Sequence, residues 1–135
     1  SGPVSVRNVL VHPDVDAAVF ETARGGILRE GLGFDQCAVA VVTNIGQGDH
    51  LGLGFVETAD ELAAVKQVIV RNVAPDGTAV LNAADPRVAA MSHACPGRVL
   101  YFARDGRHPV AAGHRARGGR AVFVDRDAVV AEASR

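Results

Sequence analysis

Aromatic residues are scarce in this sequence, which holds five Phe, one Tyr and no Trp among its 135 residues. A hydrophobic core must therefore be built from Val, Ala and Leu, and this composition favours layered α/β packing over an aromatic-rich β-sandwich. The length suits one domain with a modest core and is too short for two. We predict a single domain over residues 1–135.

Lysine is nearly absent, since Lys66 is the single lysine beside thirteen arginines. The formal net charge of −1 argues against nucleic acid or an anionic membrane surface as a non-specific partner. No apolar run reaches the roughly 18 residues that a membrane-spanning helix needs, and the sequence does not open on a secretory signal. We therefore expect a cytoplasmic protein that uses neither nucleic acid nor membrane as a partner.

Cysteine is rare, and two common catalytic motifs are missing. Cys37 and Cys95 lie far apart and lack a Cys-x-x-Cys spacing, which favours small, buried, reduced thiols over a disulfide or a metal site. The sequence contains neither the phosphate loop Gly-x-x-x-x-Gly-Lys-Ser/Thr nor the Gly-x-Ser-x-Gly elbow of serine hydrolases. It therefore supports neither nucleotide binding by a loop of its own nor serine-hydrolase chemistry.

Short apolar runs alternate with helical patterns along the chain. This succession implies right-handed crossovers and a parallel sheet. We predict an α/β fold: a three-layer, Rossmann-like, mainly parallel sheet of about four strands with a C-terminal β-hairpin. The predicted strands are residues 17–21, 39–44, 78–81 and 98–103, and the hairpin strands are 121–124 and 128–131.

Local signals mark the helices between these strands. Thr58 and Glu61 form a capping-box pattern that opens an amphipathic helix reaching residue 73. Asp85 before Pro86 is a typical N-cap and first helical position. Residues 6–11 resemble the end of a helix, 27–32 a short helix or loop, and 105–119 show no regular pattern.

Polar residues follow the first two predicted strands. Glu21 ends the first strand, and Asn44, Asp49 and His50 follow the second. Ligands of open α/β sheets bind beyond the carboxyl ends of the strands, and a carboxylate with an imidazole is a plausible divalent-metal pair. The alternatives are a Glu21 that caps a helix or contacts an arginine, and a His50 that is an ordinary loop residue.

Lys66 has an unusual position on the predicted helix. It lies four residues after Leu62 and three before Ile69, so it falls on or beside the apolar face. An ammonium group there requires a carboxylate partner or a modification that reverses its charge. The alternative is a solvated surface lysine.

Three segments together resemble the cyanophycin synthetase family, and more narrowly the second half of its Mur-ligase-like central domain. They are Glu-Thr-Ala-Arg-Gly-Gly-Ile-Leu at 21–28, Thr-Asn-Ile at 43–45 with Asp-His-Leu-Gly at 49–52, and Leu-Asn-Ala at 81–83 with Asp-Pro at 85–86. The resemblance covers residues 5–132.

The resemblance implies an ATP-dependent amide ligase. In this family ATP phosphorylates a carboxylate, and an amine attacks the acyl phosphate to form an amide and release ADP. Cyanophycin synthetase joins arginine to an aspartate side chain in this way. The implied roles are Mg²⁺ ligands for Glu21 and His50, carbamylation for Lys66, and substrate binding for Thr22, Arg24 and Asn44.

The sequence also departs from the family pattern. The family's phosphate loop lies upstream of the position of Glu21, and its adenine-binding motif and C-terminal lobe lie downstream; the sequence contains none of them. The family's Gly-Glu-Asp-His reads here Gly-Gln-Gly-Asp-His at 46–50. We therefore expect a partial Mur-ligase-like central domain, with ATP bound by the complete family enzyme and not by this chain alone.

Three interpretations remain open at this point. The chain is an incomplete or degenerate module of a ligase, one chain of a split ligase whose second chain supplies the phosphate loop, or a non-catalytic binding or scaffold protein on the inherited fold. Each leaves an open apolar edge of a parallel sheet, which calls for a partner. We expect a homo-oligomer or a complementary chain.

Overall fold

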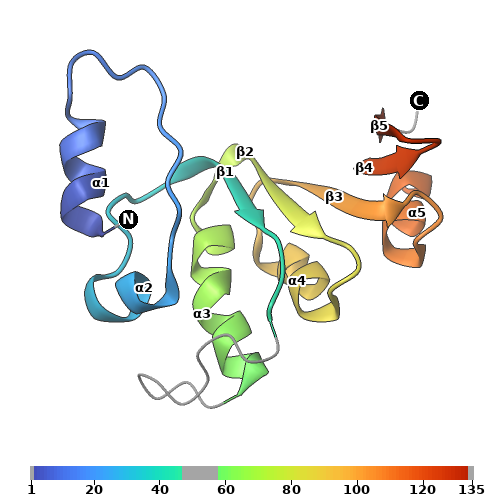
Figure 1. The fold of residues 1–135 in the computed structure, drawn as a ribbon, viewed down its shortest axis with the longest axis horizontal. Helices are drawn as coiled ribbons and strands as arrows, with labels where there is room; N and C mark the ends of the chain where they lie inside the picture. The colour runs from blue at the N-terminus through green and yellow to red at the C-terminus, as the bar shows by residue number, and fades with distance from the viewer. Residues whose placement is uncertain (1, 47–57, 134–135) are drawn as a thin grey trace.

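A five-stranded sheet organises the chain in the computed structural model, which describes residues 2–46 and 58–133 (Figure 1). The strand order is β1-β2-β3-β4-β5; the first four strands are parallel and β5 is antiparallel to β4. The predicted mainly parallel α/β fold with a C-terminal hairpin is confirmed. The strands are β1 (Cys37–Val42), β2 (Val73–Asn82), β3 (Arg98–Asp105), β4 (Arg120–Asp125) and β5 (Ala128–Ala133).

Two of the helices begin at the N-caps that the sequence predicts, Thr58 and Asp85. The Thr58 hydroxyl accepts a hydrogen bond from the Glu61 amide, and the Glu61 carboxylate accepts one from the Thr58 amide, so the predicted capping box is present. None of the described helices is long and apolar enough to cross a membrane. The helices are α1 (Pro3–Leu10), α2 (Arg24–Glu30), α3 (Ala59–Arg71), α4 (Pro86–Ala90), the 3₁₀ helix η1 (Met91–Ala94) and α5 (Pro109–Ala116).

Helices α3, α4 and α5 pack on one face of the sheet. The buried Tyr101 side chain on β3 joins two of them, because its hydroxyl donates to the Ala89 carbonyl in α4 at 2.9 Å and its ring meets His114 of α5 edge-on. Helix α3 contacts η1, which follows α4 directly. Leu81 and Val70 are fully buried between the sheet and these helices, so the core lies on this side.

The opposite face of the sheet keeps apolar side chains in solvent. Val39 and Val41 of β1 are 56% and 57% exposed, whereas their neighbours Ala40 and Val42 are buried. In the sheet register Val41 lies beside Val80, and Val80 lies beside Leu100. We call the surface formed by Val39, Val41, Val80 and Leu100 the open face. Parallel sheets normally bury both faces, so this surface is suited to being covered by another structure.

The predicted strand at residues 17–21 is wrong. The segment forms neither helix nor strand in the structure, and Val19 is fully exposed. An apolar run shows only that a segment suits a sheet, whereas a strand also requires a hydrogen-bonded neighbour. Among the described residues β1 forms a ladder with β2 alone.

Two boundaries also differ from the prediction. Strand β2 begins at Val73 and not at Thr78, because a bulge in its pairing with β1 accommodates Pro75 within the strand. Helix α5 lies in the segment 105–119, where we predicted no regular element. Its signal was Pro109 at the first helical position, in a stretch otherwise dominated by Gly, His and Arg.

Replacing one apolar residue on each face of the sheet tests this one-sided packing. Leu81→Ala removes a fully buried side chain, and we expect it to lower the free energy of unfolding by about 2–5 kcal/mol. The control Val41→Ala, on the open face, should cost less than about 0.5 kcal/mol. Urea denaturation measures both. Equal losses would show that the open face is covered in solution.

Candidate functional site

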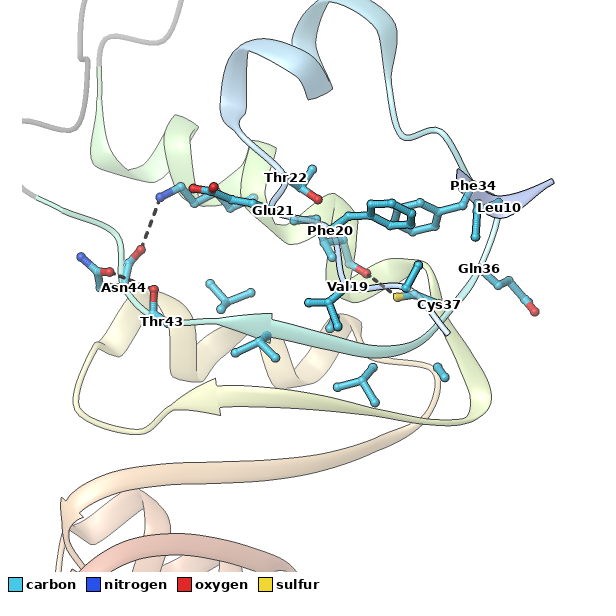
Figure 2. Close-up of a pocket in the computed structure, with 18 residues that line it drawn as sticks. Leu10, Val19, Phe20, Glu21, Thr22, Phe34, Gln36, Cys37, Thr43 and Asn44 are labelled. Atoms are coloured by element: carbon cyan, nitrogen blue, oxygen red, sulfur yellow. Dashed lines mark hydrogen bonds between the residues drawn. The ribbon is translucent and has the colours of Figure 1, made fainter. Parts of the chain in front are cut away.

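A pocket of about 890 Å³ lies between the extended segment 18–22 and the outer edge of β1. Figure 2 shows Val19, Phe20 and Glu21 running beside β1 in the same direction as the chain from Cys37 to Asn44. The two flanks of the pocket are therefore parallel, extended segments.

The two ends of the pocket differ in chemistry. Phe20, Phe34 and Leu10 lie toward one end, together with Cys37 (Figure 2). The opposite end is polar and holds Glu21, Thr43 and Asn44 (Figure 2), with Thr22 next to Glu21 in the chain and Lys66 hydrogen-bonded to the Asn44 carbonyl. We call these five residues the polar end. It lies just beyond the carboxyl end of β1, where ligands of parallel sheets bind.

Side chains from three elements hold the backbone at the polar end. The Lys66 ammonium on α3 donates to the Asn44 carbonyl oxygen at 3.4 Å. The Asn82 amide, at the end of β2, donates to the Thr43 carbonyl oxygen at 2.8 Å. The Asp85 carboxylate, the N-cap of α4, accepts from the Ile45 amide at 2.7 Å. Two consecutive peptide units after β1, Thr43–Asn44 and Asn44–Ile45, are thus fixed from outside the strand.

The side chains of Thr43 and Asn44 remain available at the pocket. Both residues are exposed, and the Thr43 hydroxyl donates to the Asn44 side-chain oxygen at 3.0 Å. With their backbones held and their side chains exposed, these residues present a hydroxyl and an amide at the pocket that Glu21 also lines. A hydroxyl and an amide can each donate a hydrogen bond to a polar ligand and accept one from it.

The structure brings four of the six predicted site residues together. Glu21, Thr22, Asn44 and Lys66 line the pocket, and Lys66 is half-buried, as its helical position predicted. Arg24 begins α2 and is not among the lining residues. His50, together with Asp49, lies outside the described residues. The proposed roles of all six stay predictions.

Asn82 and Thr43 belong to this site although we had assigned neither a role. Asn82 occurs at the end of an apolar strand, one position past Leu81, which pairs with Val42. The parallel pairing of β1 with β2 thus brings Asn82 to Thr43. The sequence signal was the polar pair Asn82 and Asp85 directly after that strand. We had interpreted Asp85 only as a helix cap, a role that the structure confirms.

Cys37, in the apolar part of the pocket, is a poor candidate for chemistry. Burial raises the pKa of the Cys37 thiol, and the nearby Cys95 raises it further. Its sulfur donates to the Asn72 carbonyl oxygen at 3.6 Å. A protonated thiol is neither an effective nucleophile nor a metal ligand, which agrees with the predicted structural role.

Among the described residues, no group of three or more His, Cys, Asp and Glu side chains is arranged to hold a metal ion. A cation at the polar end would therefore depend on Glu21 together with neutral oxygen donors, or on groups from elsewhere. Magnesium sites commonly combine one or two protein carboxylates with phosphate and water oxygens. The donors at the polar end are compatible with such a site.

The chain matches the Mur ligase middle domain family over residues 4–128 and belongs to that family, with which its mainly parallel α/β fold is consistent. Within it, the chain is similar to cyanophycin synthetases. It is 50% identical to the Synechocystis sp. enzyme over 119 residues, which are 88% of this chain and 14% of the relative. It is 48% identical to the Geminocystis herdmanii enzyme over 125 residues, 93% of this chain and 14% of the relative.

These comparisons confirm the resemblance drawn from the three sequence segments. The Nostoc sp. cyanophycin synthetase is likewise 47% identical over 119 residues. The chain spans only 13–14% of the length of these relatives. The similarity therefore identifies the domain family of this chain, but it does not by itself assign the activity of the whole enzymes to the chain.

Lys66→Ala tests whether the lone lysine holds the polar end. Loss of the hydrogen bond to the Asn44 carbonyl should lower the free energy of unfolding by about 0.5–1.5 kcal/mol. The matched control is Arg71→Ala on the same helix, where an exposed hydrogen bond to Gln67 should contribute only about 0.3–0.5 kcal/mol. Thermal denaturation measures both. An unchanged melting temperature for Lys66→Ala would mean that this lysine has no structural part in the site.

Proposed function

We propose that this chain forms the metal- and substrate-binding side of an ATP-dependent amide ligase of the cyanophycin synthetase type. The observation that carries the proposal is the gathering of Glu21, Thr22, Asn44 and Lys66 at one end of one pocket, from three separate parts of the chain. The relatives named above supply the class of reaction. By the family's chemistry the product would be an amide between arginine and an aspartate side chain.

Glu21 is the residue that we assign to Mg²⁺. Glu21 lines the polar end together with Thr43 and Asn44, and their carboxylate, hydroxyl and amide oxygens are donors that suit this ion. We assign His50, outside the described residues, as a second ligand. When bound, the ion neutralises the negative charge of the phosphate groups during phosphoryl transfer.

Lys66 would serve the same end of the pocket in one of two forms. As an ammonium group, it holds the Asn44 carbonyl and places a positive charge near Glu21 and the phosphate. As a carbamate, it would become an acidic oxygen ligand and add to the metal site. Thr22 would hydrogen-bond the substrate carboxylate, and Arg24 at the start of α2 would pair with it through its guanidinium group.

The nucleotide itself requires groups that this sequence does not contain. No Gly-x-x-x-x-Gly-Lys-Ser/Thr loop occurs among the 135 residues, so we propose that ATP is held by a complementary part of the ligase. The outer edge of β1, which pairs with no other described segment, and the parallel segment 18–22 leave room between them for an added extended chain. The open face is suited to a covering layer. Either surface supports a partner for this chain.

An exchange of domains tests the proposed function. We define a hybrid ligase as the Synechocystis enzyme in which the matching 119 residues are replaced by those of this chain. We expect arginine-dependent ADP release within about tenfold of the parent, because half of the exchanged positions are identical. Glu21→Gln in the hybrid ligase should lower kcat at least 100-fold by removing a charge from the Mg²⁺ site, a loss of about 2.7 kcal/mol in transition-state stabilisation.

The matched control is Glu30→Gln. This exposed residue ends α2 and lies outside the pocket lining, so its change should leave kcat within twofold. A folded but inactive hybrid ligase, or one in which Glu21→Gln is as active as Glu30→Gln, would contradict the proposal and favour a binding or scaffold role.

The chain should associate when it is isolated. We expect a two-fold dimer that covers the open face or the edge of β1, since β1 exposes Val39 and Val41 and, among the described residues, pairs on one side only. Light scattering after size exclusion, at several concentrations, measures the mass. The variant Val41→Asp should shift the equilibrium toward monomer, and a monomeric parent at high concentration would refute association through these surfaces.

A further inference from the structure

The turn between β2 and α4 makes two hydrogen bonds that the capping of α4 does not require. Asn82 donates to the Thr43 carbonyl at 2.8 Å, and Asp85 accepts from the Ile45 amide at 2.7 Å. Both bonds span about forty positions of sequence. Thr43 and Ile45 flank Asn44, so the two bonds hold the peptide on either side of a residue at the polar end.

Each of these side chains is itself locked by its own turn. The Asn82 side-chain oxygen accepts from the Ala84 amide at 2.9 Å, which orients the amide nitrogen toward Thr43. One Asp85 oxygen accepts from the Arg87 and Val88 amides, which leaves the other for Ile45. Because the local hydrogen bonds restrict the rotamers of Asn82 and Asp85, these side chains hold Thr43 and Ile45 more rigidly.

The Ile45 anchor point is buried, whereas Thr43 and Asn44 are exposed. Ile45 is 7% exposed and Ala83, between the two side chains, is 2% exposed. Asn44 is exposed at the pocket. The hydrogen bonds therefore connect the core to the pocket surface across one residue.

We infer that Asn82 and Asp85 are positioning residues, which hold the Thr43–Ile45 peptide so that Thr43 and Asn44 face the reacting groups. They act through the backbone and do not touch the substrate. The expected effect on kcat rests on the proposed function. The restraint of the Thr43–Ile45 backbone by Asn82 and Asp85 can be measured independently.

Asp85→Ser separates the two tasks of Asp85. Serine is a good N-cap, so α4 keeps its cap, but its shorter side chain has a single oxygen and cannot also reach Ile45. The matched control is Thr58→Ala, which removes the cap of α3 and touches neither the pocket nor the turn.

The first measurement is amide hydrogen exchange by NMR on the 135-residue chain. Asp85→Ser should speed exchange of the Ile45 amide at least tenfold more than that of the β2 and β3 amides, which report global unfolding. Thr58→Ala should change all of these amides by the same factor. Equal acceleration of Ile45 and the sheet amides in Asp85→Ser would overturn the inference.

The second measurement is steady-state kinetics in the hybrid ligase. Asp85→Ser and Asn82→Ala should each lower kcat at least tenfold with KM for ATP changed less than threefold, and Thr58→Ala should leave kcat within twofold. Unchanged kcat in both turn variants would overturn the positioning role even if the Ile45 amide is exposed. An inactive hybrid ligase would instead refute the proposed function, and the exchange measurement would then decide whether Asp85 holds the peptide.

Discussion

The parallel pairing of β1 with β2 is the constraint on which the site depends. It brings the ends of the two strands to the same edge of the sheet, so that Asn82 at the end of β2 meets the peptide after β1. Helix α3 returns between the two strands and carries Lys66 back to the same edge. Without this register, Asn82, Lys66 and Asp85 would not reach the same short stretch of backbone, and Thr43 and Asn44 would have no fixed position.

Much of this arrangement is predictable from local sequence signals. The capping box at Thr58, the N-cap at Asp85 and the apolar runs predict the helices and most of the strands, because each depends on groups a few residues apart. The motifs around Glu21 and Asn44 predict the pocket end, and the helical position of Lys66 predicts that it is half-buried.

The remaining features depend on contacts between distant segments. Residues 17–21 have the composition of a strand but form no ladder with any other described segment. Composition alone does not reveal whether a segment has a neighbour to pair with. The bulge that accommodates Pro75 arises from the pairing with β1. The bond from Asn82 to Thr43 depends on the strand register, so Asn82 could be identified as a polar strand-end residue but not as a support for the site.

The most direct test of the central claim is a crystal structure of the hybrid ligase with ADP and Mg²⁺. We expect an ion within about 2.1 Å of a Glu21 oxygen, the distance usual for Mg²⁺, on the side of the pocket that holds Thr43 and Asn44. An ion bound by other residues, with the Glu21 carboxylate turned into solvent, would contradict the assignment of the polar end to the ligase reaction.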